Sequence, residues 1–218
     1  MMRKIVVAIF LTGALLADLH AQESYIWVFL NTNPLREELS EEETADIQRR
    51  HMENIMRLAK EDKLLVAGPF NGGGGIFVMN TADLDQAKEW VITDPAIRAG
   101  RFNIEMFTWT SRIGRACLAD ENASMAEHTF VRYVPHITKF NVQQSPRLYL
   151  EHDRYLEKNL ERGNVLTEGI FDNNDGGIVI FDEEPDRSVI MEDPTVVEGI
   201  FIPEIRTIWL ADGSFCKD

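Results

Sequence analysis

The chain has 218 residues, of which 44% are hydrophobic and 27% charged, a composition typical of soluble globular proteins with a buried core. Its formal net charge of −14 repels nucleic-acid phosphates and anionic lipid surfaces, which argues against both as partners. An acidic surface that keeps the protein soluble explains this charge more simply than an acidic binding site does.

The first 21 residues have the pattern of a secretory signal peptide. A basic start, Met1 to Lys4, precedes an apolar run of 13 residues from Ile5 to Ala17, and Ala21 is a small residue suited to cleavage. As a helix the run covers about 20 Å, less than the roughly 30 Å hydrocarbon core of a membrane. A retained membrane anchor is the alternative. We expect cleavage after residues 1–21 and an extracytoplasmic protein, periplasmic or secreted, with no membrane association afterwards.

The remaining chain contains two similar halves. In order, the first half has a histidine, a glycine, an Asp-Pro pair, a second glycine and a tryptophan: His51, Gly68, Asp94-Pro95, Gly100 and Trp109. The second half repeats these landmarks: His152, Gly169, Asp193-Pro194, Gly199 and Trp209. The offset is 101 for the first two, 99 for the next two and 100 for the last. Such spacing indicates a duplication, with repeat 1 at 22–112, a linker at 113–126 and repeat 2 at 127–218.

Each repeat is predicted to fold as β-α-β-β-α-β. In repeat 1 we expect strands and helices at residues 25–30, 41–61, 64–68, 76–80, 84–92 and 104–109. Ser40 and Glu43 form a capping-box pattern at the start of the first helix. In repeat 2 the clearest elements are residues 129–134, 146–162 and 205–209. Its second helix is predicted to be weaker, because Glu184-Pro185-Asp186 contributes little to an apolar stripe. This order suits a ferredoxin-like α+β fold, an antiparallel sheet covered by helices on one face.

Two histidines are candidate functional residues. His51 is in helical phase with Ile47 and Ile55, and His152 is in phase with Leu148, so both are expected to face the sheet. A core histidine with one hydrogen-bond partner is the simpler interpretation of such a residue. Recurrence in both halves does not distinguish the two interpretations, because a duplication copies structural residues too.

Asp94 and Asp193 each precede a proline, which favours extended backbone and makes these residues suited to end or cap an element. The functional alternative is a dyad in which the carboxylate bonds one imidazole nitrogen and raises the basicity of the other. Such a pair could take a proton from carbon or oxygen without a metal ion.

The ordered set of a helical His, an Ala-Gly-Pro hairpin and an Asp-Pro followed by Gly resembles the YciI-like (YCII-related) family. The resemblance implies ferredoxin-like modules that pair into a dimeric α+β barrel, with a His and an Asp as the active-site pair. Carried over, the catalytic residues would be His51 with Asp94 and His152 with Asp193. Fused copies could form the barrel within one chain, giving a monomer with an intramolecular pseudo-dimer; a homodimer is the alternative.

The two copies are unequal in this comparison. Repeat 1 keeps Gly68-Pro69, whereas repeat 2 has Gly169-Ile170 and a weaker second helix. We therefore expect repeat 1 to hold the fuller site and repeat 2 to act mainly as its structural partner.

The resemblance implies lyase- or isomerase-like proton transfer on a small oxygenated organic molecule, with no cofactor and no metal. The alternative is a non-catalytic module that binds a small ligand or a protein partner. The sequence does not identify a substrate.

Other motifs are weaker. Cys117 and Cys216 hold similar places in the two repeats and could form a disulfide, but their distance cannot be inferred from sequence, so the pairing stays open. The glycines at 72–75 suit a hairpin turn, because the Gly-Lys-Ser/Thr of a phosphate loop is missing. His128 and His136 are eight residues apart near a strand, which favours surface or edge roles over metal binding.

Overall fold

The structure is a computed structural model that describes residues 24–139, 143–160 and 164–216. The predicted signal peptide, residues 1–21, lies outside these ranges. Within them, none of the helices has the length and apolar character required to cross a membrane.

The first half follows the predicted order of elements, with one additional short helix. Its elements are β1 (Ser24–Thr32), α1 (Glu41–Lys60), β2 (Leu64–Pro69), β3 (Gly75–Met79), α2 (Leu84–Val91), α3 (Pro95–Arg98) and β4 (Phe102–Ile113). The predicted capping box is present at the start of α1. The Ser40 Oγ accepts a hydrogen bond from the backbone N–H of Glu43, and the Glu43 carboxylate accepts one from the N–H of Ser40.

The second half has the same order of elements. They are β6 (Met125–Pro135), α4 (Ser145–Leu160), β7 (Val165–Phe171), β8 (Gly177–Phe181), α5 (Ser188–Met191), α6 (Pro194–Val197) and β9 (Phe201–Ala211), with 3₁₀ turns η1 (Ile137–Lys139) and η2 (Asp172–Asn174). The second helix, whose sequence pattern is the weaker one, is shorter than its counterpart: α5 has four residues, whereas α2 has eight.

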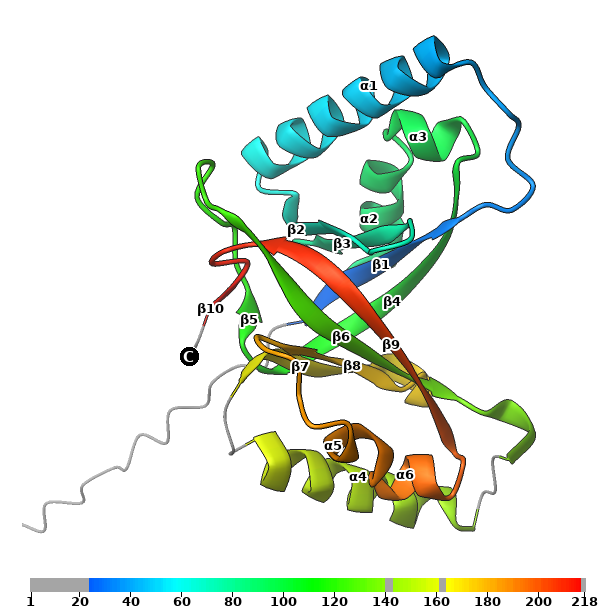
Figure 1. The fold of residues 1–218 in the computed structure, drawn as a ribbon, viewed down its shortest axis with the longest axis vertical. Helices are drawn as coiled ribbons and strands as arrows, with labels where there is room; N and C mark the ends of the chain where they lie inside the picture. The colour runs from blue at the N-terminus through cyan, green and yellow to red at the C-terminus, as the bar shows by residue number, and fades with distance from the viewer. Residues whose placement is uncertain (1–23, 140–142, 161–163, 217–218) are drawn as a thin grey trace, which may run out of the picture.

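One antiparallel sheet unites the two halves into a single α+β fold. Its eight strands are arranged in the order β2-β3-β1-β4-β7-β8-β6-β9. The two end strands also meet, because Phe70, which follows β2, forms a bridge with Ile208 of β9, and the Asn71 N–H donates to the Thr207 carbonyl at 3.0 Å. The sheet therefore closes on itself. Helices α1–α3 lie on one side and α4–α6 on the opposite side (Figure 1).

The halves join at two seams that have equivalent glycines. At one seam Trp109 of β4 lies opposite Phe171 of β7, and a Cβ on Gly169 would collide with the Thr110 carbonyl oxygen. At the other, a Cβ on Gly68 would collide with the backbone oxygen of Trp209. The recurrence of glycine at these places thus has a packing cause: the strands approach too closely for a side chain.

Alternate residues of the strands supply two kinds of core. Trp27 and Phe29 of β1 point into the closed sheet and pack on Phe130 of β6, with ring centroids about 6 Å apart. Ile26 and Val28 point outward and pack beneath α1 and α2. This period-two alternation explains why every residue of β1 from 25 to 30 is buried.

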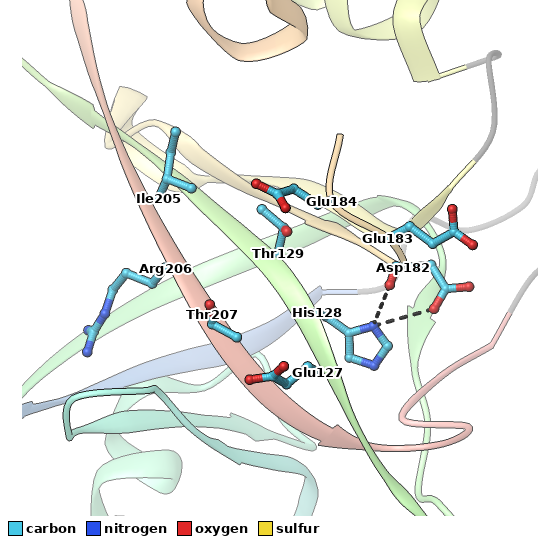
Figure 2. Close-up of a pocket in the computed structure, with 9 residues that line it drawn as sticks. All are labelled: Glu127, His128, Thr129, Asp182, Glu183, Glu184, Ile205, Arg206 and Thr207. Atoms are coloured by element: carbon cyan, nitrogen blue, oxygen red, sulfur yellow. Dashed lines mark hydrogen bonds and ion pairs between the residues drawn. The ribbon is translucent and has the colours of Figure 1, made fainter. Parts of the chain in front are cut away.

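The short α5 leaves part of the outer sheet surface open. Ile26 pairs with Met79 at the end of β3, and Thr129 pairs with Phe181 at the end of β8, so the two residues hold equivalent positions. Ile26 is fully buried, whereas Thr129 lines a hollow of about 370 Å³ (Figure 2). The other residues that line it are Glu127, His128, Asp182, Glu183, Glu184, Ile205, Arg206 and Thr207.

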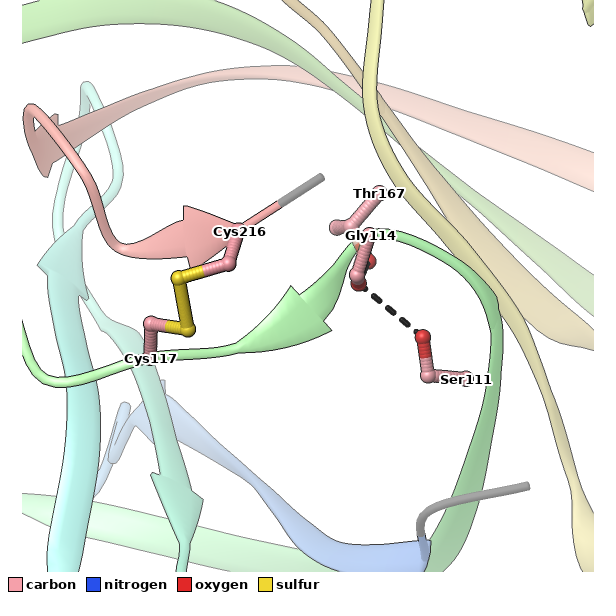
Figure 3. Close-up of a disulfide and its surroundings, with 5 residues drawn as sticks. All are labelled: Ser111, Gly114, Cys117, Thr167 and Cys216. Atoms are coloured by element: carbon pink, nitrogen blue, oxygen red, sulfur yellow. Dashed lines mark hydrogen bonds between the residues drawn. A yellow bond between two sulfur atoms is a disulfide. The ribbon is translucent and has the colours of Figure 1, made fainter. Parts of the chain in front are cut away.

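A disulfide ties the connection between the halves to the end of the chain. Cys117 and Cys216 are bonded, with their Cα atoms 5.9 Å apart (Figure 3). Beside the bond, two short strands, β5 (Arg115–Ala116) and β10 (Phe215–Cys216), pair with each other. The segment expected to be a linker, residues 113–126, is therefore partly ordered as a strand.

Candidate active site

The first half brings His51 and Asp94 together. His51 lies on the buried face of α1, and Asp94 immediately precedes α3; the His51 Nδ1 and the Asp94 Oδ2 are 2.7 Å apart. Both side chains are buried, Asp94 completely. A carboxylate accepts hydrogen bonds, so we assign the proton to Nδ1. Nε2 is then the unprotonated nitrogen of the neutral ring.

Asp94 also caps a helix, as its place before Pro95 suggests. Its Oδ1 accepts hydrogen bonds from the backbone N–H groups of Ala96 and Ile97, at 2.9 and 3.2 Å. The Asn54 amide donates to the other oxygen at 3.3 Å. The capping interpretation and the dyad interpretation are thus compatible, because each uses a different carboxylate oxygen.

The second half contains the same arrangement. His152 lies on α4, and its Nδ1 is 2.6 Å from the Oδ2 of Asp193, which precedes α6. The Oδ1 of Asp193 accepts from the backbone N–H of Thr195 at 2.9 Å and from its hydroxyl at 2.5 Å. Asp193 is fully buried, and His152 is nearly so. Among the described residues, every hydrogen bond of the His152 ring involves Nδ1.

Aromatic side chains surround both imidazoles. The His51 ring stacks on Phe77, with centroids 6.0 Å apart, and lies 6.1 Å from Phe102. The His152 ring meets Tyr133 and Phe201 edge-on, at 4.9 and 5.2 Å. These contacts leave each ring little rotational freedom.

Tyr133 also stays protonated. Burial raises the pKa of Tyr133 well above its ordinary value, and the negative charge of Asp193 raises it further. The second dyad is therefore accompanied by a neutral phenol across the neutral pH range.

The second dyad opens onto a cavity. His152 lines a space of about 110 Å³ together with Tyr149, Phe171 and Phe201. In the first half a cavity of about 170 Å³ lies near Ala96, but its walls do not include His51. The expectation that repeat 1 holds the fuller site is thus not supported by these cavities.

The cavity beside His152 lies at a seam between the halves. Its walls include Ile170 and Phe171 of β7, which pair with β4 of the first half. Asp153, at its edge, accepts a hydrogen bond from Arg112 of β4 at 2.6 Å. Sequence analysis did not identify Arg112, because no local motif links it to residues about 40 positions away.

Arg112 is also held by a buried carboxylate. Its Nε donates to both oxygens of Glu168, at 2.9 and 3.2 Å, and its NH2 donates to one of them at 2.5 Å. Burial alone lowers the pKa of Arg112, but Glu168 and then Asp153 more than offset this and raise the pKa above its ordinary value. The guanidinium therefore remains charged and fixed.

The two remaining candidate histidines lie apart from the dyads. His128 lines the hollow of Figure 2, where its Nδ1 is 3.3 Å from the Asp182 carbonyl and 3.4 Å from the Asp182 carboxylate. It is buried rather than on the surface as expected. The His136 Nδ1 is 3.3 Å from the Gly199 carbonyl. In the described part of the chain, no group of three or more His, Cys, Asp or Glu side chains is arranged to hold a metal ion.

A comparison with protein families matches one segment of the chain to the YCII-related domain. Residues 27–110 are the matching segment. This YCII-related segment contains His51, Asp94 and every strand of the first half except the outermost residues of β1 and β4. The match supports the resemblance found in the sequence for the first half.

The comparison with curated proteins finds no match for this chain. Among solved structures, a protein of Fusobacterium nucleatum named "putative monooxygenase" matches at 9% identity with a TM-score of 0.50, covering 92% of this chain and 99% of that one. A protein of the same description from Lactobacillus acidophilus matches at 10% identity with a TM-score of 0.48, covering 89% of this chain and 99% of that one. At such identity the Fusobacterium protein indicates a shared fold and nothing about the reaction.

Proposed function

We propose that this chain is an exported protein made of two YCII-related copies, in which the second copy carries a cofactor-free acid–base site. One observation carries the proposal. The His152 Nδ1 and the Asp193 Oδ2 form a buried contact of 2.6 Å, and the His152 ring also lines a cavity. The YCII-related segment supports the family assignment of the first copy. The equal order of elements in both halves supports the duplication.

The chemistry follows from the tautomer. Asp193 accepts the Nδ1 proton of His152, so the Nε2 lone pair is available as a general base. Nε2 takes a proton from an acidic C–H or O–H group of a small oxygenated molecule, and the electron pair of the broken bond stays on the substrate as an enolate or alkoxide. Asp193 stabilises the imidazolium. Return of the proton to another atom gives an isomerase, and loss of a leaving group gives a lyase.

The first dyad, His51 with Asp94, has the same geometry but a different role in this proposal. Phe77 stacks on the His51 ring, and the neighbouring cavity is lined without it. We assign this pair to the structure of the first copy. The matched pairs in the two halves therefore provide internal controls for each other.

Solvent-proton exchange tests the proposal even while the product is unidentified. The purified chain is incubated in D₂O with a panel of small aldehydes, ketones and hydroxy acids, and deuterium at carbon is measured by mass spectrometry. We expect exchange with at least one compound, and a rate reduced at least about a hundredfold in His152→Ala and Asp193→Asn. His51→Ala and Asp94→Asn should retain it. Full exchange in folded Asp193→Asn would refute the acid–base role.

A non-catalytic binding module is the second candidate. The hollow of about 370 Å³ beside β6 and β9 favours it, because none of the residues that line this larger space belongs to either dyad. Under this alternative the protein retains a small ligand without converting it. Native mass spectrometry of the purified chain would detect such a ligand, which would be recovered chemically unchanged.

Export and assembly are part of the same proposal. The signal-like residues 1–21 and the Cys117–Cys216 disulfide both suit an oxidising compartment outside the cytoplasm. The bridge between Phe70 and Ile208 brings the two end strands of the described sheet together, which favours a monomer over a homodimer. N-terminal sequencing of the exported protein and light scattering test these two points.

A further inference from the structure

The cavity beside His152 has a largely aromatic wall. Tyr149 and Phe201 stack on each other at 5.3 Å with an angle of 13° between their planes, and Phe171 also lines the space. Ile170 completes the apolar side, while His152 and Asp153 supply the polar groups. Flat aromatic surfaces favour flat ligands, because a planar ring gains stacking contacts that a puckered ring loses.

The size of the cavity limits the ligand. At about 110 Å³ it is smaller than the engineered apolar cavity of about 150 Å³ that admits benzene. The mouth is open to solvent, so substituents can extend outward. The cavity is therefore too small to enclose a fused ring system, and a single ring can occupy it only with part of its edge exposed at the mouth.

The charge at the mouth comes from both halves. Arg112 of the first half binds Asp153 and Glu168 of the second, so one positive charge faces two negative charges. The cluster is net negative, and Asp153 is its half-exposed member at the cavity. An anionic ligand is repelled there, whereas a hydroxyl or amine can donate a hydrogen bond to the carboxylate.

The first half lacks these features at equivalent positions. With the offset of 101 that relates His51 to His152 on the two helices, Tyr149 corresponds to Gln48 and Asp153 to Met52. Tyr149 and the Asp153 carboxylate are therefore specific to the second half, whereas Phe201 has a counterpart in Phe102 beside His51. These two side-chain differences leave the shared fold unchanged and alter what the cavity can bind.

We propose that the second-half cavity binds a neutral, planar, single-ring molecule with a hydrogen-bond donor, that Tyr149 and Asp153 determine this specificity, and that Arg112 is the positioning residue that fixes Asp153. This inference rests on the proposed function for the location of the site and adds its ligand class. In this proposal the second-half site depends on the first half, because Arg112 of the first half holds Asp153.

Binding of three simple probes to the full chain tests the ligand class. Phenol is planar, neutral at pH 7 and a donor; benzoate is planar and anionic; cyclohexanol is a neutral donor but puckered. Dissociation constants are measured by two-dimensional NMR titration. We expect phenol to bind about three- to tenfold more tightly than either of the others, as the usual energy of an aromatic contact implies. Equal affinity for phenol and benzoate overturns the proposal.

Three variants locate the specificity. Tyr149→Gln, which introduces the residue of the first half, should remove the preference for phenol over cyclohexanol. Asp153→Asn should remove the discrimination against benzoate while Arg112 keeps its pair with Glu168. Met52→Asn, the matched change on the exposed face of α1, should alter neither ratio. An unchanged phenol-to-benzoate ratio in Asp153→Asn contradicts the role of this residue.

Arg112→Met tests the positioning role and also leaves Glu168 buried without its partner, so it is combined with a measurement of folding. If the variant folds, it should lose discrimination against benzoate as Asp153→Asn does; a folded variant with the wild-type ratio contradicts the positioning role. If it unfolds, Asp153→Asn decides on the ligand class alone.

The binding assay separates this inference from the proposed function. Asp193 is fully buried and does not line the cavity, so Asp193→Asn should keep the preference for phenol over cyclohexanol, which depends on stacking with Tyr149 and not on the His152 tautomer. Loss of deuterium exchange in that variant together with equal binding of the three probes would leave the acid–base site intact and refute the ligand class. Retained deuterium exchange in that variant together with tighter binding of phenol than of the other two probes would refute the acid–base site alone.

Discussion

Asp193 uses its two carboxylate oxygens for two different contacts. One carboxylate oxygen caps α6 and the other holds the His152 ring, and Asp94 does the same for α3 and His51. An Asp-Pro pair suits this place, because the proline begins the short helix and the aspartate caps it while holding the histidine. Recurrence of the pair alone does not distinguish structure from catalysis, since both tasks require the same residue.

Substitution of Asp193 should separate its two tasks. Asp193→Asn keeps an oxygen that can cap α6 but loses the charge opposite Nδ1, so the free energy of unfolding should fall by about 1–3 kcal/mol. Asp193→Ala loses the cap as well and should lower it by a further amount of about 0.5–2 kcal/mol. Urea unfolding measures both values. Nitrogen NMR of the His152 ring should show the proton moved to Nε2 in Asp193→Asn; an unchanged tautomer would contradict the assignment.

Tyr133 predicts a loss of stability at high pH. Burial, followed by the charge of Asp193, raises its pKa in the folded state above the ordinary value of 10.0. The stabilisation is fully present below pH 10 and is lost as pH rises further, because the unfolded chain releases a proton that the folded chain retains. The free energy of unfolding should fall by about 1.4 kcal/mol per pH unit from this group.

Tyr133→Phe is the matched variant for that prediction. It keeps the ring that contacts His152 but has no proton to release, so its unfolding free energy should decline less steeply above about pH 10. Urea titrations at several pH values between about 9 and 11 compare the two proteins. Parallel declines would mean that Tyr133 does not contribute.

At the scale of elements, most helices and strands could be predicted because their signals are local. The capping box at Ser40 predicted the start of α1, and the weak helical pattern at Glu184-Pro185-Asp186 agrees with a helix that begins only at Ser188. The two-residue strands β5 and β10 could not be predicted, since they exist only where distant segments meet beside a disulfide.

The candidate site was predictable in part. The pairing of each His with its Asp was implied by the resemblance to the YCII-related family, but the cavity beside His152 could not be predicted. That difference depends on packing between strands: Phe77 stacks on His51, whereas Tyr133 and Phe201 meet His152 edge-on. Arg112 could not be found either, because its contact with Asp153 of α4 spans 41 residues and joins the two halves.

The seam glycines give a prediction at the same scale. Gly68→Ala and Gly169→Ala each place a Cβ against a carbonyl oxygen of the partner strand, so each should lower the free energy of unfolding by about 1–3 kcal/mol or more. Gly100→Ala meets nothing within 4 Å and has only the cost of its positive φ of 63°, about 1–2 kcal/mol. Chemical denaturation of the three variants provides the comparison. Smaller losses at both seams than at Gly100 would contradict the close approach.

At the scale of the molecule, the two halves depend on each other. Each seam pairs a strand of one half with a strand of the other, and the aromatic residues inside the closed sheet come from both. A single half would expose this interior as well as two sheet edges. The two halves also differ locally: the second has a cavity beside His152, and the first supplies Arg112, which binds Asp153 at its edge.

The disulfide reinforces this mutual dependence, because it joins the start of the connection to the end of the second half. Cys117 and Cys216 are 99 residues apart in the sequence. The loop that they close contains every helix of the second half and every second-half strand of the large sheet. Closing so long a loop removes entropy from the unfolded chain, so Cys117→Ser should lower the free energy of unfolding by about 2–5 kcal/mol. Cys216→Ser and the double variant should show the same loss, since any one change opens the loop. Thermal unfolding of the oxidised protein, the reduced protein and the three variants measures this loss of stability.

The same experiment shows whether the halves unfold together. Because the loop includes α4, α6 and the seam at Ile170, the loss should appear as lower stability of one cooperative transition. A separate early transition of the second half would instead mean that the halves unfold independently.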